Sequence, residues 1–417
     1  MKQENLPVRV GITSLQAGEN VNSIAPVQWD PYDSSLAADP YPTYRRLRDE
    51  APLYYNEEHD FYALSRYADC ERGLPDWETY RSGRGMVLEI IKAGIEIPPG
   101  TLIMEDPPVH TIHRRLLVRV FTPRRISALE PRVREFCANA LDPYRSRDRF
   151  DLMEALGGEL PMRVIGMLLG IPEAEQASVR DHVDSSMRIQ DGSGINVADT
   201  AILSGEIYGD YIDWRRDNPS NDLMTDLLYT EFDDENGVRR TLTRDEVLGY
   251  VNILSGAGNE TTGRLVGWIG STLAAHPDQR QELVDDPSLI PNAVEEVLRY
   301  EPPSMAISRY VTRDVGWHGT TVPAGSALVF LVGSANRDDR RFPRGDVFDI
   351  HREVGQHLTL GLGAHYCLGA ALARLQGRIA LEELLARFPR WDVDWENATM
   401  AQTSTVRGWE KLPVVIP

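Results

Sequence analysis

Most of this chain repeats its apolar residues every three to four positions, the period of an amphipathic helix. The clearest such stretch begins at Thr243, where Glu246 three residues later completes a capping box, and it continues to His276 before Pro277 stops it. At 1.5 Å per residue this predicts a helix of about 33 residues and about 50 Å. A helix of that length is expected to cross the whole molecule.

Other helices are predicted from their end signals and from the same period. One begins at Asp106 and Pro107, with the Asp106 side chain as N-cap, and ends near Phe121; another begins at Pro291 and is ended by Pro302. Weaker helical patterns cover about 123–141, 159–170, 174–188, 199–217 and 368–388.

The remaining segments are short and β-like or irregular. Residues 52–65 predict two strands around a polar turn, and further strands are expected at 307–312, 320–322, 328–332 and the C-terminus. Residues 342–356 predict a charged, irregular meander. Residues 80–107 mix Gly and Pro with apolar side chains, which is typical of a loop that covers a site. The fold class is therefore mainly α with a smaller β part.

Domain organisation follows from where the periodicity starts. Residues 1–28 have no periodicity and predict a flexible tail, whereas no linker interrupts residues 29–417, which predict a single domain. The 417 residues are 42% hydrophobic and 26% charged, as in a folded domain with a substantial core.

Charge and cysteine usage exclude several classes of protein. The net charge of −19 argues against binding to nucleic acid, which needs a concentrated basic surface. Three distant cysteines fit neither a disulfide framework nor a structural zinc site and indicate a reducing compartment. No segment has the apolar length for membrane insertion, so a cytoplasmic protein is expected.

One of the three cysteines, Cys367, lies in the sequence LGLGAHYCLG, directly before a predicted helix. A helix N-terminus and nearby backbone N–H groups stabilise a thiolate, which is a soft metal ligand. The alternative is an inert, buried cysteine, which is the commoner situation for a lone Cys. A dinucleotide-binding loop is a poorer match, because Tyr366 occupies the position of the third glycine.

The centre of the long helix reads AGNETT, which is unusual for a helix interior. A glycine there costs about 1 kcal/mol relative to Ala. The small Ala257 and Gly258 would allow a flat cofactor or dioxygen to approach the backbone, and Glu260 with Thr261 would form a proton-transfer chain. The alternative is a kinked helix with a satisfied threonine and a salt-bridged glutamate.

Two charged pairs have helical spacing. Glu296 and Arg299 are three residues apart, and His110 and Arg114 are four apart, so each pair shares one helix face. Alone, Glu296 and Arg299 are most simply a surface ion pair worth about 0 to 1 kcal/mol. His110 and Arg114 alone are most simply a solvated helix face.

Together these features resemble the cytochrome P450 superfamily. LGLGAHYCLG resembles its cysteine loop, which implies that Cys367 is the axial thiolate of a haem iron, while Leu360 stands where the family usually has Phe. AGNETT resembles the oxygen-binding groove. Glu296 and Arg299 resemble an E-x-x-R pair that would lock the cysteine loop with Arg352.

The resemblance implies the cytochrome P450 fold, with haem b (iron protoporphyrin IX) between the long helix and the cysteine loop. It implies hydroxylation of an apolar small molecule (terpenoid, steroid, fatty acid or aromatic) by a monomeric enzyme, with O2 and two electrons from a ferredoxin-type donor and its reductase. The residues implied to hold the haem or its propionates are His110, Arg114, Ala257, Gly258, Arg309, Leu360, Gly361, His365, Cys367 and Gly369. The implied walls of the substrate pocket are Met86, Val87, Leu88, Leu254, Met305, Ile307 and Thr405.

Two other functions remain open at this point. The same fold would serve a peroxygenase, or a haem-dependent isomerase or dehydratase, without a redox partner, although such reactions have less need of Glu260 and Thr261. A haem-binding sensor or carrier without turnover is the third possibility.

Overall fold

The computed structural model describes residues 26–186, 205–401, 403 and 406–417. Most of the predicted tail, the ends of the helical patterns at 174–188 and 199–217, and Thr405 fall outside these residues. The helices are α1 (Ser34–Ala38), α2 (Tyr41–Glu50), α3 (Tyr67–Gly73), α4 (Leu88–Ala93), α5 (Val109–Val118), α6 (Pro123–Ser127), α7 (Glu130–Leu141), α8 (Glu159–Leu169), α9 (Gln176–Ser186), α11 (Gly209–Asp217), α12 (Leu223–Tyr229), α13 (Arg244–Ala275), α14 (Pro277–Asp285), α15 (Ile290–Tyr300), α16 (Val332–Ala335) and α17 (Ala370–Arg387).

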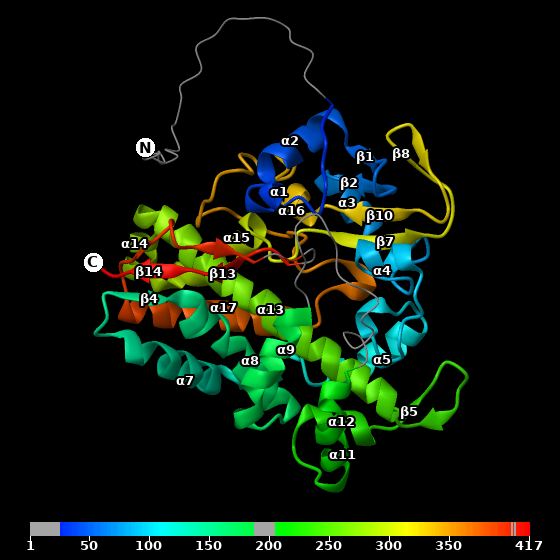
Figure 1. Cartoon of the computed structure of the whole chain (residues 1–417), viewed down its shortest axis with the longest axis horizontal. Helices are drawn as coiled ribbons and strands as arrows, with labels where there is room; N and C mark the ends of the chain where they lie inside the picture. The colour runs from blue at the N-terminus through cyan, green and yellow to red at the C-terminus, as the bar shows by residue number, and fades with distance from the viewer. Residues whose placement is uncertain (1–25, 187–204, 402, 404–405) are drawn as a thin grey trace, which may run out of the picture.

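The strands are short, and most of them gather in two places, on one side of the molecule and near the C-terminus, while β5 lies beside α12 (Figure 1). They are β1 (Leu53–Asn56), β2 (Phe61–Leu64), β3 (Tyr80–Arg81), β4 (Arg149–Asp151), β5 (Phe232–Asp233), β6 (Arg239–Arg240), β7 (Ile307–Val311), β8 (Val315–Trp317), β9 (Thr320–Val322), β10 (Ala327–Phe330), β11 (Asp392–Val393), β12 (Thr399–Met400), β13 (Trp409–Lys411) and β14 (Pro413–Val415). The prediction of a mainly α fold with a smaller β part is confirmed.

The long central helix is α13, and its predicted start is correct. The Thr243 hydroxyl accepts a hydrogen bond from the Glu246 N–H (3.2 Å), and the Glu246 carboxylate accepts one from the Thr243 N–H (2.7 Å). The helix has 32 residues and ends at Ala275, just before Pro277 begins α14. In Figure 1 it runs diagonally through the molecule, where it packs against α8, α15 and α17.

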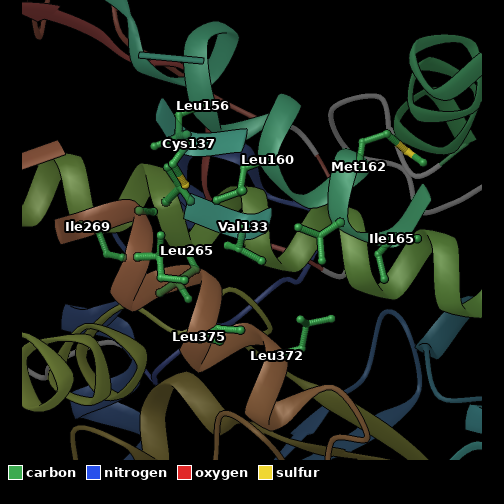
Figure 2. Close-up of a cluster of buried hydrophobic side chains, with 14 of the residues drawn as sticks. Val133, Cys137, Leu156, Leu160, Met162, Ile165, Leu265, Ile269, Leu372 and Leu375 are labelled. Carbon is green, nitrogen blue, oxygen red and sulfur yellow. The ribbon is translucent and has the colours of Figure 1, made fainter. Parts of the chain in front are cut away.

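The main core lies where α7, α8, α13 and α17 meet (Figure 2). Leu160 of α8, Leu265 and Ile269 of α13 and Leu372 of α17 are all buried there. Cys137 is fully buried in the same cluster, so it is packed as a small apolar side chain. This core holds α13 and the start of α17 in fixed positions relative to each other.

The largest sheet has the order β1-β2-β10-β7-β3 and joins distant parts of the chain. β1 and β2 form the predicted hairpin, β10 pairs parallel to β2, and β7 pairs antiparallel to β10 with Arg309 opposite Leu328. The predicted strands in these regions are confirmed. The sheet fixes Arg309 on a central strand.

Three local predictions were wrong. Asp106 does not cap the helix that follows: α5 begins at Val109, and the Asp106 carboxylate accepts hydrogen bonds from the N–H groups of Ser82 (2.9 Å) and Gly83 (3.0 Å). The pattern at 123–141 forms two helices, α6 and α7, separated at Ala128. The irregular stretch at 80–107 contains the helix α4, which Gly94 ends in a left-handed conformation (φ 60°).

Among the described residues, no helix combines the length and apolar character needed to cross a membrane.

Candidate active site

The cysteine loop places Cys367 immediately before α17. Gly361 and Gly363 have φ of 68° and 67°, a left-handed conformation that favours glycine. A Cβ on Gly363 would also lie 2.7 Å from Cα of Pro75. These two turns bring the Cys367 N–H to the carbonyl of Leu360 (2.7 Å), which closes the loop.

The Cys367 side chain is half-buried and its thiol forms no disulfide. Burial raises the pKa of this thiol, while the N–H of Gly369 and the charges of Arg114 and Arg374 lower it. A bound metal ion would overcome the effect of burial, because a coordinating thiol loses its proton outright. The surroundings of Cys367 therefore suit a metal thiolate better than a free one.

The centre of α13 has one exposed and one buried side. Ala257 is exposed and Thr261, one turn later, is half-buried, whereas Glu260 is buried. The Thr261 hydroxyl donates to the Ala257 carbonyl (2.6 Å), and a Glu260 carboxylate oxygen lies 3.5 Å from a guanidinium nitrogen of Arg264. A satisfied threonine and a paired glutamate were features of the alternative interpretation, and both are present.

Close packing between two helices explains why position 258 is a glycine, and the sequence did not indicate this. A Cβ at this position would lie 2.6 Å from Cδ1 of Ile165 on α8. The glycine therefore permits the close approach of α8 and α13, independently of any cofactor.

Four basic side chains from three separate elements form the predicted cluster. His110 and Arg114 come from α5, Arg309 from β7 and His365 from the cysteine loop. The rings of His110 and His365 lie 4.2 Å apart. Arg309 is buried and donates to the carbonyl of Ser308 (2.9 Å), and Arg114 donates to the carbonyl of Tyr366 (2.5 Å).

Asp106 acts on Arg309 by its charge, but the two histidines of this cluster have buried ring nitrogens that lack hydrogen-bond partners among the described residues. These atoms are both ring nitrogens of His110 and Nε2 of His365. Burial, with the charges of neighbouring cations, lowers the pKa of His110 to about 4 and of His365 to about 3, and burial lowers that of Arg309 to about 10. Two carboxylates would supply the missing acceptors and stabilise the charged forms. The residues present therefore fit a haem, whose two propionates would lie among them and whose iron would meet Cys367.

The Glu296–Arg299 pair is wholly buried. The Arg299 guanidinium donates twice to the Glu296 carboxylate (2.7 Å each), and Nε of Arg352 donates to the same carboxylate (3.1 Å). Arg299 also donates to the carbonyls of Asn336 and Gly345, at 2.8 Å each. These contacts tie α15 to residues 336–352, and the expectation that the three side chains lock the cysteine loop stays a prediction.

Asn336, which sequence reasoning missed, carries that connection on toward the cysteine loop. Its amide nitrogen donates to the Thr359 hydroxyl (2.8 Å), and its amide oxygen accepts from the Leu358 N–H (2.8 Å). The Thr359 hydroxyl in turn donates to the carbonyl of Leu298 on α15 (2.6 Å). No sequence motif marks Asn336, because its partners lie far from it along the chain.

The predicted pocket walls divide into two groups. Leu88 and Met305 are buried in a core cluster with Trp29 and Leu331, so ordinary packing accounts for them. The side chains of Met86, Val87, Leu254 and Ile307 are half-buried.

Comparisons with known proteins agree with this geometry. Residues 210–405 match the family model described as Cytochrome P450. The chain is 39% identical to "Putative cytochrome P450 123" of Mycobacterium tuberculosis, over 93% of this chain and 96% of that protein. It is 35% identical to "Vitamin D(3) 25-hydroxylase" of Pseudonocardia autotrophica, over 93% and 96%.

A solved structure has the same fold. The crystal structure of CYP109E1 from Bacillus megaterium in complex with testosterone superposes with a TM-score of 0.83 at 28% identity, covering 92% of this chain and 99% of that one. The identity to curated relatives over nearly the whole length, and this fold, show that the chain belongs to the cytochrome P450 family of haem-thiolate monooxygenases.

Proposed function

We propose that this enzyme hydroxylates an apolar small molecule, such as a terpenoid, steroid, fatty acid or aromatic compound, with haem b as its cofactor. The observation that carries the proposal is the cluster of His110, Arg114, Arg309 and His365 beside Cys367, with unpartnered buried nitrogens suited to two carboxylates. When bound, the haem supplies the activation of dioxygen. The protein supplies binding, orientation and protons.

Proton delivery is assigned to Thr261 and Glu260. Thr261 lies on the more exposed side of α13, where its hydroxyl now donates to the Ala257 carbonyl and would be the proton donor nearest to the haem side of the helix. Glu260 is the adjacent acid and would restore that proton. Relays of this kind are needed when dioxygen is reduced, which favours a monooxygenase over a peroxygenase or an isomerase.

The substrate class rests on the half-buried apolar side chains at Met86, Val87, Leu254 and Ile307. Burial of an apolar ligand against such a surface is worth about 25 cal/mol per Å². Two similar proteins are described with apolar molecules of this kind: one is named a vitamin D(3) 25-hydroxylase, and the other was solved in complex with testosterone.

A separate electron donor is required by the family, and we propose a ferredoxin-type protein with its reductase. Arg115, Arg119, Arg124 and Arg125 are exposed within eleven positions, and none forms an ion pair with another described residue. In a chain with a net charge of −19, this patch would attract an acidic partner. It follows Arg114, which bonds the cysteine loop, so a partner docked there would lie near Cys367.

The remaining proposals concern the state of the protein. The free, buried Cys70 and Cys137 suit a reducing compartment, so we propose a cytoplasmic protein. We also propose that it is a monomer and that residues 29–417 form one domain.

The absorption spectrum of the reduced protein under carbon monoxide tests the proposal. A strongly red-shifted Soret band is expected in the wild type, and Cys367→Ser should abolish it. Absence of the band in the wild type would contradict thiolate ligation. Extraction of the cofactor with acidified solvent should release unmodified haem b.

Reconstitution with a ferredoxin and its reductase distinguishes the remaining functions. Product that forms with peroxide but never with NAD(P)H and the donor would indicate a peroxygenase. A spectrum unresponsive to any apolar ligand would indicate a sensor. Arg124→Glu/Arg125→Glu should raise the KM for the ferredoxin, and the exposed Arg313→Glu serves as a control.

A further inference from the structure

Arg264 lies on α13 one turn after Glu260, and its guanidinium joins two different parts of the site. One nitrogen is 3.5 Å from the Glu260 carboxylate, and another donates to the backbone carbonyl of Trp409 in β13. The exposed fractions are 13% for the Arg264 side chain and 3% for Glu260, so solvent screens this pair little. Within the part of the chain that the structure describes, Nε of Arg264 is buried and has no hydrogen-bond partner.

The hairpin around β13 holds Arg264 closely. A Cβ on Gly408 would lie 2.7 Å from both Cβ and Cδ of Arg264, so only glycine leaves room for the side chain. Trp409 packs against Trp268 of α13, with ring centroids 5.6 Å apart, and its indole N–H donates to Ser271 (2.9 Å). The guanidinium is therefore fixed by contacts that do not involve Glu260.

The same hairpin also contacts the chain just before β7. Val406 forms an isolated β-bridge with Ser304, next to Met305, and the Arg407 N–H donates to the carbonyl of Pro303 (2.7 Å). Arg264 thus connects the C-terminal hairpin to the acid on α13.

We propose that Arg264 is the positioning residue for Glu260. It holds the Glu260 side chain in a fixed orientation beside Thr261 and ties that orientation to the hairpin of β12 and β13. This inference rests on the proposed role of Glu260 as proton donor. No motif of the sequence marked Arg264.

The first test uses Arg264→Gln, with Arg264→Lys as the conservative variant. In Arg264→Gln, product formed per electron consumed should fall about fivefold and the solvent isotope effect on turnover should rise, while Arg264→Lys should recover at least half of the coupling. Arg280→Gln is the matched control, because Arg280 likewise donates to a tryptophan carbonyl, that of Trp391, away from Glu260. An unchanged carbon monoxide spectrum confirms that each variant is folded.

The second test reads Glu260 directly, without turnover. Infrared difference spectra, assigned by subtraction of Glu260→Gln, should show a Glu260 carboxyl band that is shifted in Arg264→Gln relative to the wild type. Gly408→Ala, which displaces Arg264 but keeps both charges, should reproduce the uncoupling. Wild-type coupling and infrared bands in Arg264→Gln would overturn the inference.

The two proposals fail separately. If Glu260→Gln couples like the wild type, Glu260 is not the proton donor, and the premise of the inference is overturned with it. If Glu260→Gln uncouples and Arg264→Gln does not, only the role of Arg264 is wrong.

Discussion

Truncation of Arg299 should prevent stable binding of haem. Arg299→Ala would remove two charged hydrogen bonds to Glu296 of 2.7 Å each, from a pair whose side chains are both 0% exposed. It would also leave the carbonyls of Asn336 and Gly345 without this donor. Because Asn336 bonds Thr359 and Leu358, the damage would reach the segment that leads into the cysteine loop.

The expected loss in the free energy of unfolding follows from the burial of the groups that Arg299 contacts. Removing one partner of a buried ion pair costs about 3–5 kcal/mol, and each buried carbonyl that loses its donor costs about 1–3 kcal/mol more. A loss of at least about 5 kcal/mol is comparable with the whole stability of a typical domain, about 5–15 kcal/mol.

Urea denaturation and haem content per chain provide the assay. Arg46→Ala is the control, because it breaks an exposed i,i+4 pair with Glu50 and should cost about 0–1 kcal/mol. If Arg299→Ala were purified with a full complement of haem and a free energy of unfolding within about 1 kcal/mol of the wild type, the pair would not lock the fold.

Three further predictions follow from the site. Thr261→Ala should uncouple electron consumption from product formation, whereas coupling measured for the neighbouring, buried Thr262→Ala should stay near wild type; tight coupling in Thr261→Ala would remove Thr261 from the relay. In the haem-free protein, burial lowers the pKa of His110 to about 4, against about 6.5 in the unfolded chain. The protein therefore keeps the full contribution of His110 to its stability above pH 6.5, and about 3 kcal/mol of the free energy of unfolding is lost as the pH falls toward 4, because the unfolded chain binds the proton first. His110→Gln should flatten this pH dependence in denaturation curves. Gly363→Ala should reduce the yield of holoprotein because of its φ of 67° and the contact with Pro75, whereas Gly316→Ala, with open space around it, should not; equal haem content in both would argue against a strained loop.

Local chemistry explains which elements were predictable. The start of α13 depended on Thr243 and Glu246, which lie within one turn of each other, and Pro277 marked its end, so neighbouring residues sufficed. Asp106 carried an equally good capping signal, but its carboxylate found donors at Ser82 and Gly83, more than twenty positions earlier. A tertiary contact of this kind leaves no periodic trace in the sequence.

Within the candidate site, too, residues with distant partners could not be predicted from spacing alone. Cys367 and the E-x-x-R pair were found because a family resemblance supplied their long-range partners, which spacing alone does not provide. Asn336 and Arg264 were missed because their partners, Thr359 and Trp409, are distant in sequence and belong to no motif. Gly258 was assigned to a cofactor, whereas its contact with Ile165 could be seen only once α8 was placed against α13.

The order of strands in the main sheet has a consequence for synthesis of the chain on the ribosome. Tyr62 of β2 pairs with Leu328 of β10, and Phe150 of β4 pairs with Val414 of β14, so both sheets need partners made much later. The unpaired edge of β2 must wait for most of the chain to emerge, and the β4 edge waits almost to the end. During that interval nascent chains would expose apolar strands, and the yield of folded enzyme should depend on chaperones that bind such strands.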